Sequence, residues 1–339
     1  MTDYLILGAG AIGGTLGFHL VRAGHRVRIV DADAEHVAAI NSAGLQVERD
    51  GVRSGVAVPA QLPTDPLPAP AGRVLLATKA QATPAAADWF ADNLAAGGFV
   101  VSVQNGLNEP LLADPLGGRR VVGCFVNIFA DAIAPGVIRD GGAGALVVGE
   151  VDGRPSERVD EVVADLQAWG PARATGNVNG FLWSKLGFGA MLVASALADA
   201  PMADLIDRHR PLMHALAREV YAVATRLPGP DGAPLRLEAF DAFDPNPYLG
   251  EDSEADRATD TLVAWLRTQS KDRSGIWRDL AVRRRPTEVP SHYREVFRIA
   301  ESLGVPTPLL RRLVDQITEL ESGGSMSEAR LDRLEETAR

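Results

Sequence analysis

A single lysine interrupts an apolar segment in the second half of the chain. Lys185 stands in WSKL, residues 183–186, and the run after it stays apolar to Ala198. A charged lysine on a buried helix is costly unless it is paired or used, and the common alternative is that its stem carries the ammonium to the surface. Lys185 is therefore either a lysine that reaches the surface or one whose charge is paired or used, and both interpretations stay open.

Arginines and a glutamate gather in a later segment. The sequence SGIWRDLAVRRRPTEV, residues 274–289, alternates arginines with apolar residues and contains Glu288 near its end. Three consecutive arginines indicate an anionic partner, but a nucleic-acid surface is not expected in a chain of net charge −10. A solvated face and the capture of a substrate carboxylate both fit this segment, and both interpretations stay open.

The N-terminal segment YLILGAGAIGG, residues 4–14, contains a glycine motif. Gly8, Gly10 and Gly13 form G-x-G-x-x-G directly after a predicted strand and at the start of a predicted helix. The first glycine permits a tight turn, the second lets the backbone approach a pyrophosphate, and the third lets the helix pack close to the strand. Free N–H groups of the helix N-terminus then face the phosphates. We expect Gly8, Gly10, Ala11, Ile12 and Gly13 to bind a dinucleotide; the alternative is a turn without ligand.

The second predicted strand ends in Asp31, eighteen residues after Gly13. An acidic residue at this place accepts hydrogen bonds from the adenosine ribose hydroxyls and repels a 2′-phosphate, so Asp31 favours NAD(H) over NADP(H). NADP(H) stays possible, since Arg28 lies close by in the sequence and the aspartate can turn toward solvent.

Polar residues also follow the third and fourth predicted strands. Lys79 and Gln81 come after the third, and Gln104-Asn105-Gly106 comes after the fourth. Doubly wound sheets bind ligands just beyond the carboxyl ends of their parallel strands. Both groups are candidates for cofactor or substrate contacts, and each is equally compatible with a solvated loop.

These residues need elements that position them, and the first half of the chain alternates short apolar runs with helical patterns. This alternation predicts a mostly parallel sheet with helices on both faces, an α/β doubly wound Rossmann domain. The strands are predicted at residues 4–7, 26–31, 73–78 and 99–103, with further strands between 121 and 149 and turns at 134–136 and 142–144. Asp50-Gly51 within GLQVERDGVRSGVAV predicts a β-hairpin, and Ser156 opens a helix predicted to run to Trp169.

After about Asn177 strand-like runs largely vanish and amphipathic helical patterns dominate, broken by a Pro/Gly/Asp-rich segment at 228–251. We therefore expect a dinucleotide-binding domain at 1–175 and a helical substrate and catalytic domain at 176–339. The sequence SGGS before Met326 suggests a hinge, followed by a last surface helix prone to fraying.

Composition bounds the class of protein. The 339 residues are 46% hydrophobic and 23% charged, which is typical of a globular protein. The acidic balance favours a small-molecule partner over nucleic acid or an anionic membrane. Cys124 is the only cysteine and is expected to be buried, and the six histidines show no metal-ligand spacing, so no metal is assigned. Without a basic segment ahead of the first apolar run or an apolar stretch long enough to span a bilayer, we expect a cytoplasmic protein.

The ordered set of motifs resembles the ketopantoate reductase family. It comprises GAGAIGG, the lysine and glutamine after the third strand, VSVQNG, APGVIRDGGAGALVVGE, WSKL, and S-x-x-x-x-D with RxTE, and the similarity runs along most of the chain. The resemblance implies a Rossmann domain joined to an all-helical domain like the C-terminal domain of 6-phosphogluconate dehydrogenase. It also implies reduction of the ketone of 2-dehydropantoate with NAD(P)H.

Carried over residue by residue, the resemblance makes Lys185 the catalytic lysine and Glu288 the active-site glutamate. Asn105 matches the asparagine that touches cofactor and substrate, and Lys79 a lysine on the nicotinamide side. Ser274 matches the first position of the family's serine pair, which here reads Ser274-Gly275. We expect Asn105, Lys185, Gly189, Ser274 and Glu288 to line the substrate site.

The chain departs from the family at its substrate positions. Gly189 and Val193 stand where asparagines are expected, four and eight residues after Lys185. The segment between Asp279 and Glu288 carries one residue more than the family's spacing. A pocket that loses two amides becomes roomier, more apolar and less suited to ketopantoate.

Other functions fit the same residues. One is reduction of a different, more apolar ketone or an imine, and another is a cofactor-binding sensor that no longer turns over. Opine-dehydrogenase-like condensation needs a catalytic histidine, for which His292 is the nearest candidate. Apolar helical faces in the second domain favour a homodimer.

Overall fold

The computed structural model describes residues 2–142, 144–269 and 271–338. The chain divides into two compact units, Met1–Val178 and Asn179–Arg339. The predicted turn at 142–144 includes residue 143 and therefore lies partly outside the described residues.

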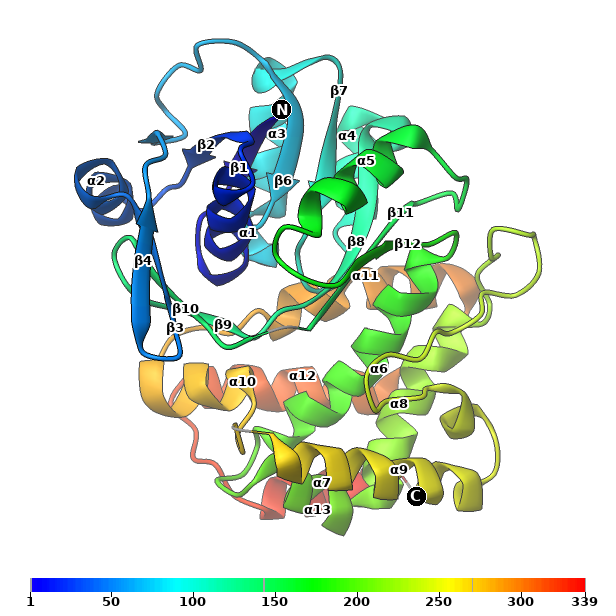
Figure 1. Ribbon diagram of the computed structural model, residues 1–339. Helices are drawn as coiled ribbons and strands as arrows, with labels where there is room; N and C mark the ends of the chain where they lie inside the picture. Colours follow the sequence, from blue (N-terminus) through cyan, green and yellow to red (C-terminus); the bar gives the residue numbers. More distant parts are fainter. Residues whose placement is uncertain (1, 143, 270, 339) are drawn as a thin grey trace. The chain divides into compact units, whose positions relative to one another are not determined.

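An eight-stranded sheet forms the centre of the first unit (Figure 1), in the order β12-β11-β8-β7-β6-β1-β2-β5. Neighbouring strands are parallel except β11 and β8, which are antiparallel. The strands are β1 (Asp3–Leu7), β2 (Arg26–Val30), β5 (Ala60–Gln61), β6 (Ala71–Leu76), β7 (Leu94–Ser102), β8 (Val121–Asn127), β11 (Ala145–Glu150) and β12 (Ala172–Ala174). The predicted parallel sheet is confirmed.

Side chains alternate between the two faces of this sheet, as a strand period of two requires. Ile6 and Leu75 belong to one apolar cluster, and their chain neighbours Leu5 and Val74 belong to another. The first cluster includes residues from α1 (Ala11–Arg22), α2 (Ala34–Ala43) and α5 (Glu157–Leu166), and the second from α3 (Thr83–Asn93) and α4 (Glu109–Leu116). Helices therefore cover both faces. Ser156 caps α5 as predicted, but the helix ends at Leu166 rather than at Trp169.

A second sheet of four strands, in the order β4-β3-β10-β9, belongs to the same unit (Figure 1). Its strands are β3 (Leu45–Arg49), β4 (Val52–Val56), β9 (Ala130–Ala134) and β10 (Val137–Asp140). The predicted hairpin joins β3 and β4, and Asp50 and Gly51 both have positive φ, 52° and 76°. This sheet packs on α1, where Gly14 leaves no room for a side chain beside Ile138.

The regular elements of the second unit, over its described residues, are helices. They are α6 (Val178–Ser195, which begins at the last residue of the first unit), α7 (Met202–Arg208), α8 (Arg210–Ala224), α9 (Asp252–Thr268), α10 (Gly275–Arg278), α11 (Val289–Leu303), α12 (Pro308–Glu321) and α13 (Ala329–Ala338), with a π turn at Asp279–Arg283 and short 3₁₀ turns such as Asn246–Leu249. Helix α8 packs against α9, α11, α12 and α13. Among the described helices, none combines the length and apolarity that a bilayer crossing requires.

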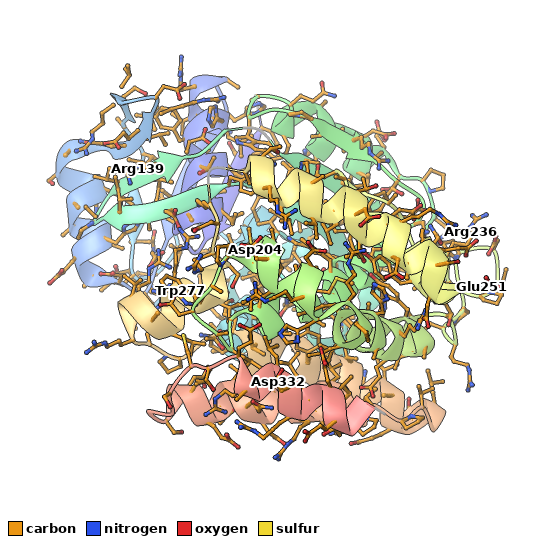
Figure 2. The ribbon with its side chains drawn as sticks, turned by 90° about the horizontal axis from the view of Figure 1, so that it is seen from below. Arg139, Asp204, Arg236, Glu251, Trp277 and Asp332 are labelled. Carbon is orange, nitrogen blue, oxygen red and sulfur yellow. The ribbon has the colours of Figure 1, made fainter. Side chains whose placement is uncertain are left out.

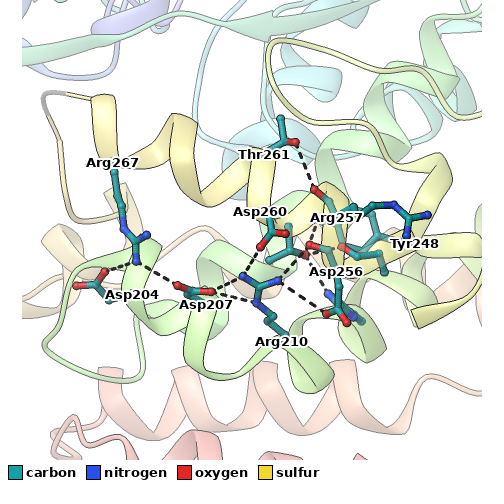
Figure 3. Close-up of polar contacts among 12 residues, drawn as sticks. Asp204, Asp207, Arg210, Tyr248, Asp256, Arg257, Asp260, Thr261 and Arg267 are labelled. Carbon is teal, nitrogen blue, oxygen red and sulfur yellow. Dashed lines mark hydrogen bonds and ion pairs between the residues drawn. The ribbon is translucent and has the colours of Figure 1, made fainter. Parts of the chain in front are cut away.

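Ion pairs tie the outer helices together at the surface (Figure 3). Arg267 on α9 contacts both Asp204 and Asp207 on α7, each over 3.1 Å, and Arg210 at the start of α8 reaches Asp260 over 2.7 Å. Each pair is partly exposed, so each contributes little to stability by itself. Because Asp207 contacts both Arg210 and Arg267, the pairs form one network across α7, α8 and α9.

The last helix packs against the rest of the second unit through one face, and its expected fraying stays a prediction. Leu331 and Leu334 are fully buried. His209 contacts the same segment, with Nδ1 2.7 Å from Glu335 and Nε2 3.1 Å from Glu328. The apolar positions 331 and 334 share one helix face and account for this packing, and the hinge at SGGS stays a prediction.

Candidate active site

The glycine loop between β1 and α1 leaves no room for a side chain at Gly8 and Gly13 but leaves space at Gly10. Gly8 has φ +92°, and a Cβ there would lie 2.7 Å from the backbone nitrogen of Thr78. At Gly13 a Cβ would lie 1.9 Å from the Gly8 carbonyl, whereas at Gly10 it would meet nothing within 4 Å. The loop is therefore packed against the sheet at Gly8 and Gly13 and accessible at Gly10, where helix α1 begins. A pyrophosphate fits this arrangement because it needs close approach to backbone N–H groups at a helix N-terminus.

Asp31 follows β2 and is anchored by backbone amides. Its Oδ2 accepts a hydrogen bond from the Ala9 N–H over 2.7 Å, and its Oδ1 accepts one from the Asp33 N–H over 2.9 Å. The carboxylate therefore points at the glycine loop and not away into solvent. Arg28, the cation closest to it in sequence, donates to Gln61 Oε1 over 3.1 Å.

A buried polar cluster joins the loops that follow β6 and β7. Gln104 Nε2 donates to the Thr78 carbonyl over 2.8 Å, and Thr83 Oγ1 donates to Asn108 Oδ1 over 2.9 Å. Asn108 Nδ2 donates to the Asn105 carbonyl over 2.8 Å. Because Gln104, Thr83 and Asn108 are each at most 4% exposed, these bonds are made away from water and fix the two loops to each other.

The predicted polar residues stand in these two loops. Lys79 directly follows Thr78 and is half-buried, and the side chain of Asn105 is exposed. Gln81 is also exposed. The glycine loop, Asp31, Lys79 and Asn105 therefore lie at one edge of the sheet of the first unit, where the contacts of Ala9 and Thr78 connect them.

Lys185 lies near the middle of α6, between two carbonyls that accept hydrogen bonds from buried tyrosines. Tyr221 Oη donates to the Ser184 carbonyl over 3.1 Å, and Tyr293 Oη donates to the Leu186 carbonyl over 3.0 Å. Both tyrosines are at most 1% exposed, while Lys185 is half-buried. Burial raises the pKa of both phenols, so they stay neutral donors. The backbone on either side of Lys185 is thus fixed to α8 and α11.

A hydroxyl from another helix lies next to the first position where an amide was expected. A Cβ at Gly189 would lie 3.3 Å from Tyr293 Oη, tighter than an ordinary contact. Val193 is 2% exposed and belongs to the core. The Tyr293 hydroxyl therefore lies next to Gly189, whereas Val193 belongs to the core, and the roomier pocket beside Lys185 stays a prediction.

Glu288 occupies the N-cap position, immediately before α11. Its Oε1 lies 3.9 Å from His292 Nε2, one helical turn on. The preceding residue, Thr287, donates from both its backbone N–H and its hydroxyl to Glu321 Oε1, each over 2.7 Å. Helix α11 also carries Tyr293, which contacts α6. Lys185 therefore lies on α6 and Glu288 immediately before α11, and the bond between Tyr293 and Leu186 joins these two helices.

The segment from Asp279 to Glu288 begins with a π turn at Asp279–Arg283, which holds one residue more per turn than an α-helix. The turn ends at Arg284, whose φ is +50°. Asp279 closes it by accepting from Arg283 Nη1 over 2.8 Å and Arg285 Nε over 3.0 Å. Two of the three consecutive arginines are thus partners of Asp279 within the chain.

Ser274 has a structural task that the sequence did not indicate. Its hydroxyl accepts the backbone N–H of Trp277 over 3.2 Å and so caps α10. Ser274 is 6% exposed, whereas Trp277, labelled in Figure 2, is half-buried and stacks with the guanidinium of Arg273.

Family models match both units of the chain. The model described as ketopantoate reductase PanE/ApbA matches residues 4–153, and the model described as ketopantoate reductase PanE/ApbA C terminal matches residues 177–321. The chain belongs to the ketopantoate reductase family. It is accordingly an NAD(P)-dependent oxidoreductase that acts on a CH–OH group, as the sequence resemblance predicted.

Individual relatives agree with this assignment. The 2-dehydropantoate 2-reductase of Pyrococcus abyssi is 30% identical over 251 residues, which cover 70% of this chain and 77% of that protein. The PanE/ApbA family ketopantoate reductase of Ralstonia eutropha JMP134 has 28% identity and a TM-score of 0.77, with coverage of 94% of this chain and 98% of that one. D-mandelate dehydrogenase, solved with NADH and anilino(oxo)acetate, shares the fold with a TM-score of 0.75 and 20% identity, over 98% of this chain and 99% of that one.

Several residues of this family member escaped sequence reasoning. Tyr293 and Glu321 contact Leu186 and Thr287, the chain neighbours of Lys185 and Glu288, and nothing in the local sequence indicates those contacts. His36 did leave a signal, because it occupies a buried position of α2 in line with Ile40. Among the described residues, no group of three His, Cys, Asp or Glu side chains is placed to hold a metal ion.

Proposed function

We propose that this protein uses NADH to reduce a 2-keto acid to the 2-hydroxy acid, with Lys185 as the general acid. The observation that carries the proposal is the position of Lys185 on α6, where hydrogen bonds from Tyr221 and Tyr293 hold the carbonyls of its two chain neighbours. A lysine on such a fixed backbone can keep its ammonium group at one place without losing further entropy on substrate binding. Membership of the ketopantoate reductase family and the P. abyssi relative support a 2-keto acid as substrate class.

The reaction needs a hydride and a proton. When bound, a reduced nicotinamide supplies the hydride that forms the new C–H bond at the carbonyl carbon. The electron pair of the C=O π bond then moves to oxygen, where Lys185 stabilises the developing charge and transfers a proton from Nζ to form the hydroxyl. Glu288 is proposed to orient Lys185 or the substrate and to set the protonation state of the lysine.

Binding of the cofactor is assigned to residues of the first unit. Backbone groups of Gly8, Gly10, Ala11, Ile12 and Gly13 are proposed to hold the pyrophosphate. Asp31 is proposed to bind the adenosine ribose, and its anchored carboxylate supports NADH over NADPH, because a 2′-phosphate beside it would be repelled. Lys79 is proposed to lie on the nicotinamide side, and Asn105 to contact both cofactor and substrate.

The second candidate substrate is a more apolar ketone or an imine. Gly189 offers no hydrogen-bonding side chain, and the Tyr293 hydroxyl beside it already donates to Leu186. A substrate that relies on amide groups at positions 189 and 193 loses those contacts here. Ser274, Gly189 and Glu288 remain proposed contacts for whichever carbonyl substrate binds.

The test is a substrate panel followed by NADH absorbance, with 2-dehydropantoate, branched 2-keto acids, aryl 2-keto acids and imines. We expect one class of carbonyl compound in the panel to oxidise NADH. We also expect Lys185→Ala to lose turnover while its affinity for NADH is kept. Lys185→Arg retains a cation but no readily transferable proton, so it should recover charge stabilisation only. Lys271→Ala removes an ammonium from the same unit as a control. NADH binding without oxidation of any panel member would instead indicate a sensor.

A further inference from the structure

Both backbone polar groups of Ala9, the residue between the first two motif glycines, are held by side chains. The Ala9 N–H donates to Asp31 Oδ2 over 2.7 Å, and the Ala9 carbonyl lies 2.9 Å from His36 Nε2. Asp31 directly follows β2 and His36 lies on α2, so side chains from two separate places in the fold bind one residue of the loop. His36 is 6% exposed, which keeps this contact away from water.

The protonation of the His36 ring follows from its second contact. The Gly136 N–H, in the turn between β9 and β10, donates to His36 Nδ1 over 3.0 Å. A backbone N–H can only donate, so Nδ1 carries no hydrogen. Nε2 must then carry the ring hydrogen and donate it to the Ala9 carbonyl. The neutral Nε2–H tautomer is therefore specified by two backbone groups that lie 127 residues apart in sequence, at Ala9 and Gly136.

Holding the Ala9 carbonyl also directs the next backbone donor. The peptide group between Ala9 and Gly10 is planar and trans, so its C=O and N–H point in opposite directions. With the carbonyl directed at His36, the Gly10 N–H points away from His36. Gly10 is also the position where a Cβ would meet nothing within 4 Å. His36 therefore fixes the direction of a backbone donor at a glycine that has open space beside it.

We propose that His36 is a positioning residue for the cofactor pyrophosphate and that it couples the loop to the second sheet. The histidine transmits the position of the β9–β10 turn, through Gly136, to the peptide plane that presents the Gly10 N–H. Preorganised donors bind an anion more tightly than mobile ones because less order is imposed on binding. The proposal rests on the proposed cofactor site but not on the proposed reaction.

The first test measures the tautomer directly. In ¹⁵N-labelled wild-type protein, the ring nitrogens of His36 should show an unprotonated Nδ1 and a protonated Nε2, assigned by comparison with His36→Gln. This measurement needs no ligand. A protonated Nδ1 at neutral pH would overturn the proposal, because the bridge to Gly136 would then be absent.

The second test separates positioning from general stability by using ligands that share an adenosine. ADP-ribose contains the pyrophosphate but no nicotinamide, and adenosine lacks the pyrophosphate. His36→Leu should raise the Kd of ADP-ribose about tenfold and leave that of adenosine within about twofold. His36→Gln, whose amide N–H can donate to Ala9, should restore most of the affinity. His25→Leu, which removes a histidine that lies near Asp165, is the matched control.

Three outcomes contradict the proposal. They are an unchanged ADP-ribose Kd in His36→Leu, an equal loss for adenosine and ADP-ribose, and failure of His36→Gln to recover binding although it melts like the wild type. Because ADP-ribose cannot take part in hydride transfer, these results do not depend on whether the protein reduces any carbonyl. Inactivity of the wild type with every keto acid would reject the proposed function and leave this inference standing.

Discussion

The hydroxyl of Tyr293 lies 3.3 Å from the place that a Cβ at Gly189 would occupy. The same hydroxyl donates to the Leu186 carbonyl over 3.0 Å, and the ring is 1% exposed, so it has little freedom to move aside. Any side chain at position 189 therefore makes a tight contact with this tyrosine from α11, which must shift by a few tenths of an ångström to admit it.

This pairing predicts that the effect of Gly189→Ala depends on residue 293. Alanine gains about 1 kcal/mol over glycine in a helix interior, but here its methyl group meets a hydroxyl that must shift to admit it. In the Tyr293→Phe background that contact is gone and the helix gain should appear in full. Urea unfolding of the wild type, both single variants and the double variant should give a coupling energy of about 1 kcal/mol. Additive effects would mean that the two residues do not share this space.

The same pair marks the limit of what the sequence could predict. The glycine loop, the Asp50-Gly51 hairpin and the helical second half are set by local patterns, and the structure confirms the corresponding elements. The partner of Gly189 comes from a helix more than a hundred residues later, and no local pattern encodes that contact. Sequence alone therefore showed neither the Tyr293 hydroxyl next to position 189 nor the burial of Val193 in the core.

Asp31 provides a prediction about cofactor choice. Asp31→Asn keeps an oxygen for the Ala9 N–H but removes the charge that would face a 2′-phosphate. The ratio of kcat/KM for NADPH to that for NADH should rise about tenfold, more at low salt than at high salt. Asp33→Asn is the control, since it removes a neighbouring charge that only caps α2. Steady-state kinetics with both cofactors measure the ratio, and equal ratios in all three proteins would reject Asp31 as the selectivity residue.

Glu109 predicts a pH dependence of stability. It is 2% exposed at the start of α4, and burial raises the pKa of its carboxyl from 4.5 to about 7. Between these two values the folded state holds a proton that the unfolded state has lost, so the free energy of unfolding falls as pH rises and levels off above about 7. In full, this loss in the free energy of unfolding is about 3 kcal/mol. The loss is absent well below pH 4.5 and complete above the pKa of Glu109 in the folded state.

Glu109→Gln tests this dependence, because its amide oxygen can still accept from the Asn108 N–H as Glu109 does over 3.1 Å. The variant should match the wild type near pH 4 and exceed its melting temperature at about pH 8. Asp160→Asn, an exposed change at the start of α5, controls for a general loss of negative charge. A difference between Glu109→Gln and wild type that does not vary with pH would show that the buried carboxyl does not titrate in this range.

The contacts of Glu321 predict that its substitution lowers kcat but leaves the Kd of the cofactor nearly unchanged. Its Oε1 accepts two hydrogen bonds from Thr287, each over 2.7 Å, and Thr287 directly precedes the proposed active-site Glu288. Glu321→Ala releases that segment and should lower kcat about tenfold or more while the Kd of NADH changes less than about twofold.

Glu321→Gln retains an oxygen that can accept both bonds, so it should keep most of the activity that Glu321→Ala loses. Glu301→Ala removes an exposed carboxylate that pairs with Arg311 in the same unit and should leave kcat unchanged. Thermal melting of each variant separates positioning from loss of fold. If Glu321→Ala melts earlier but keeps wild-type kcat and KM, Glu321 stabilises the helical unit without placing Glu288 for the reaction.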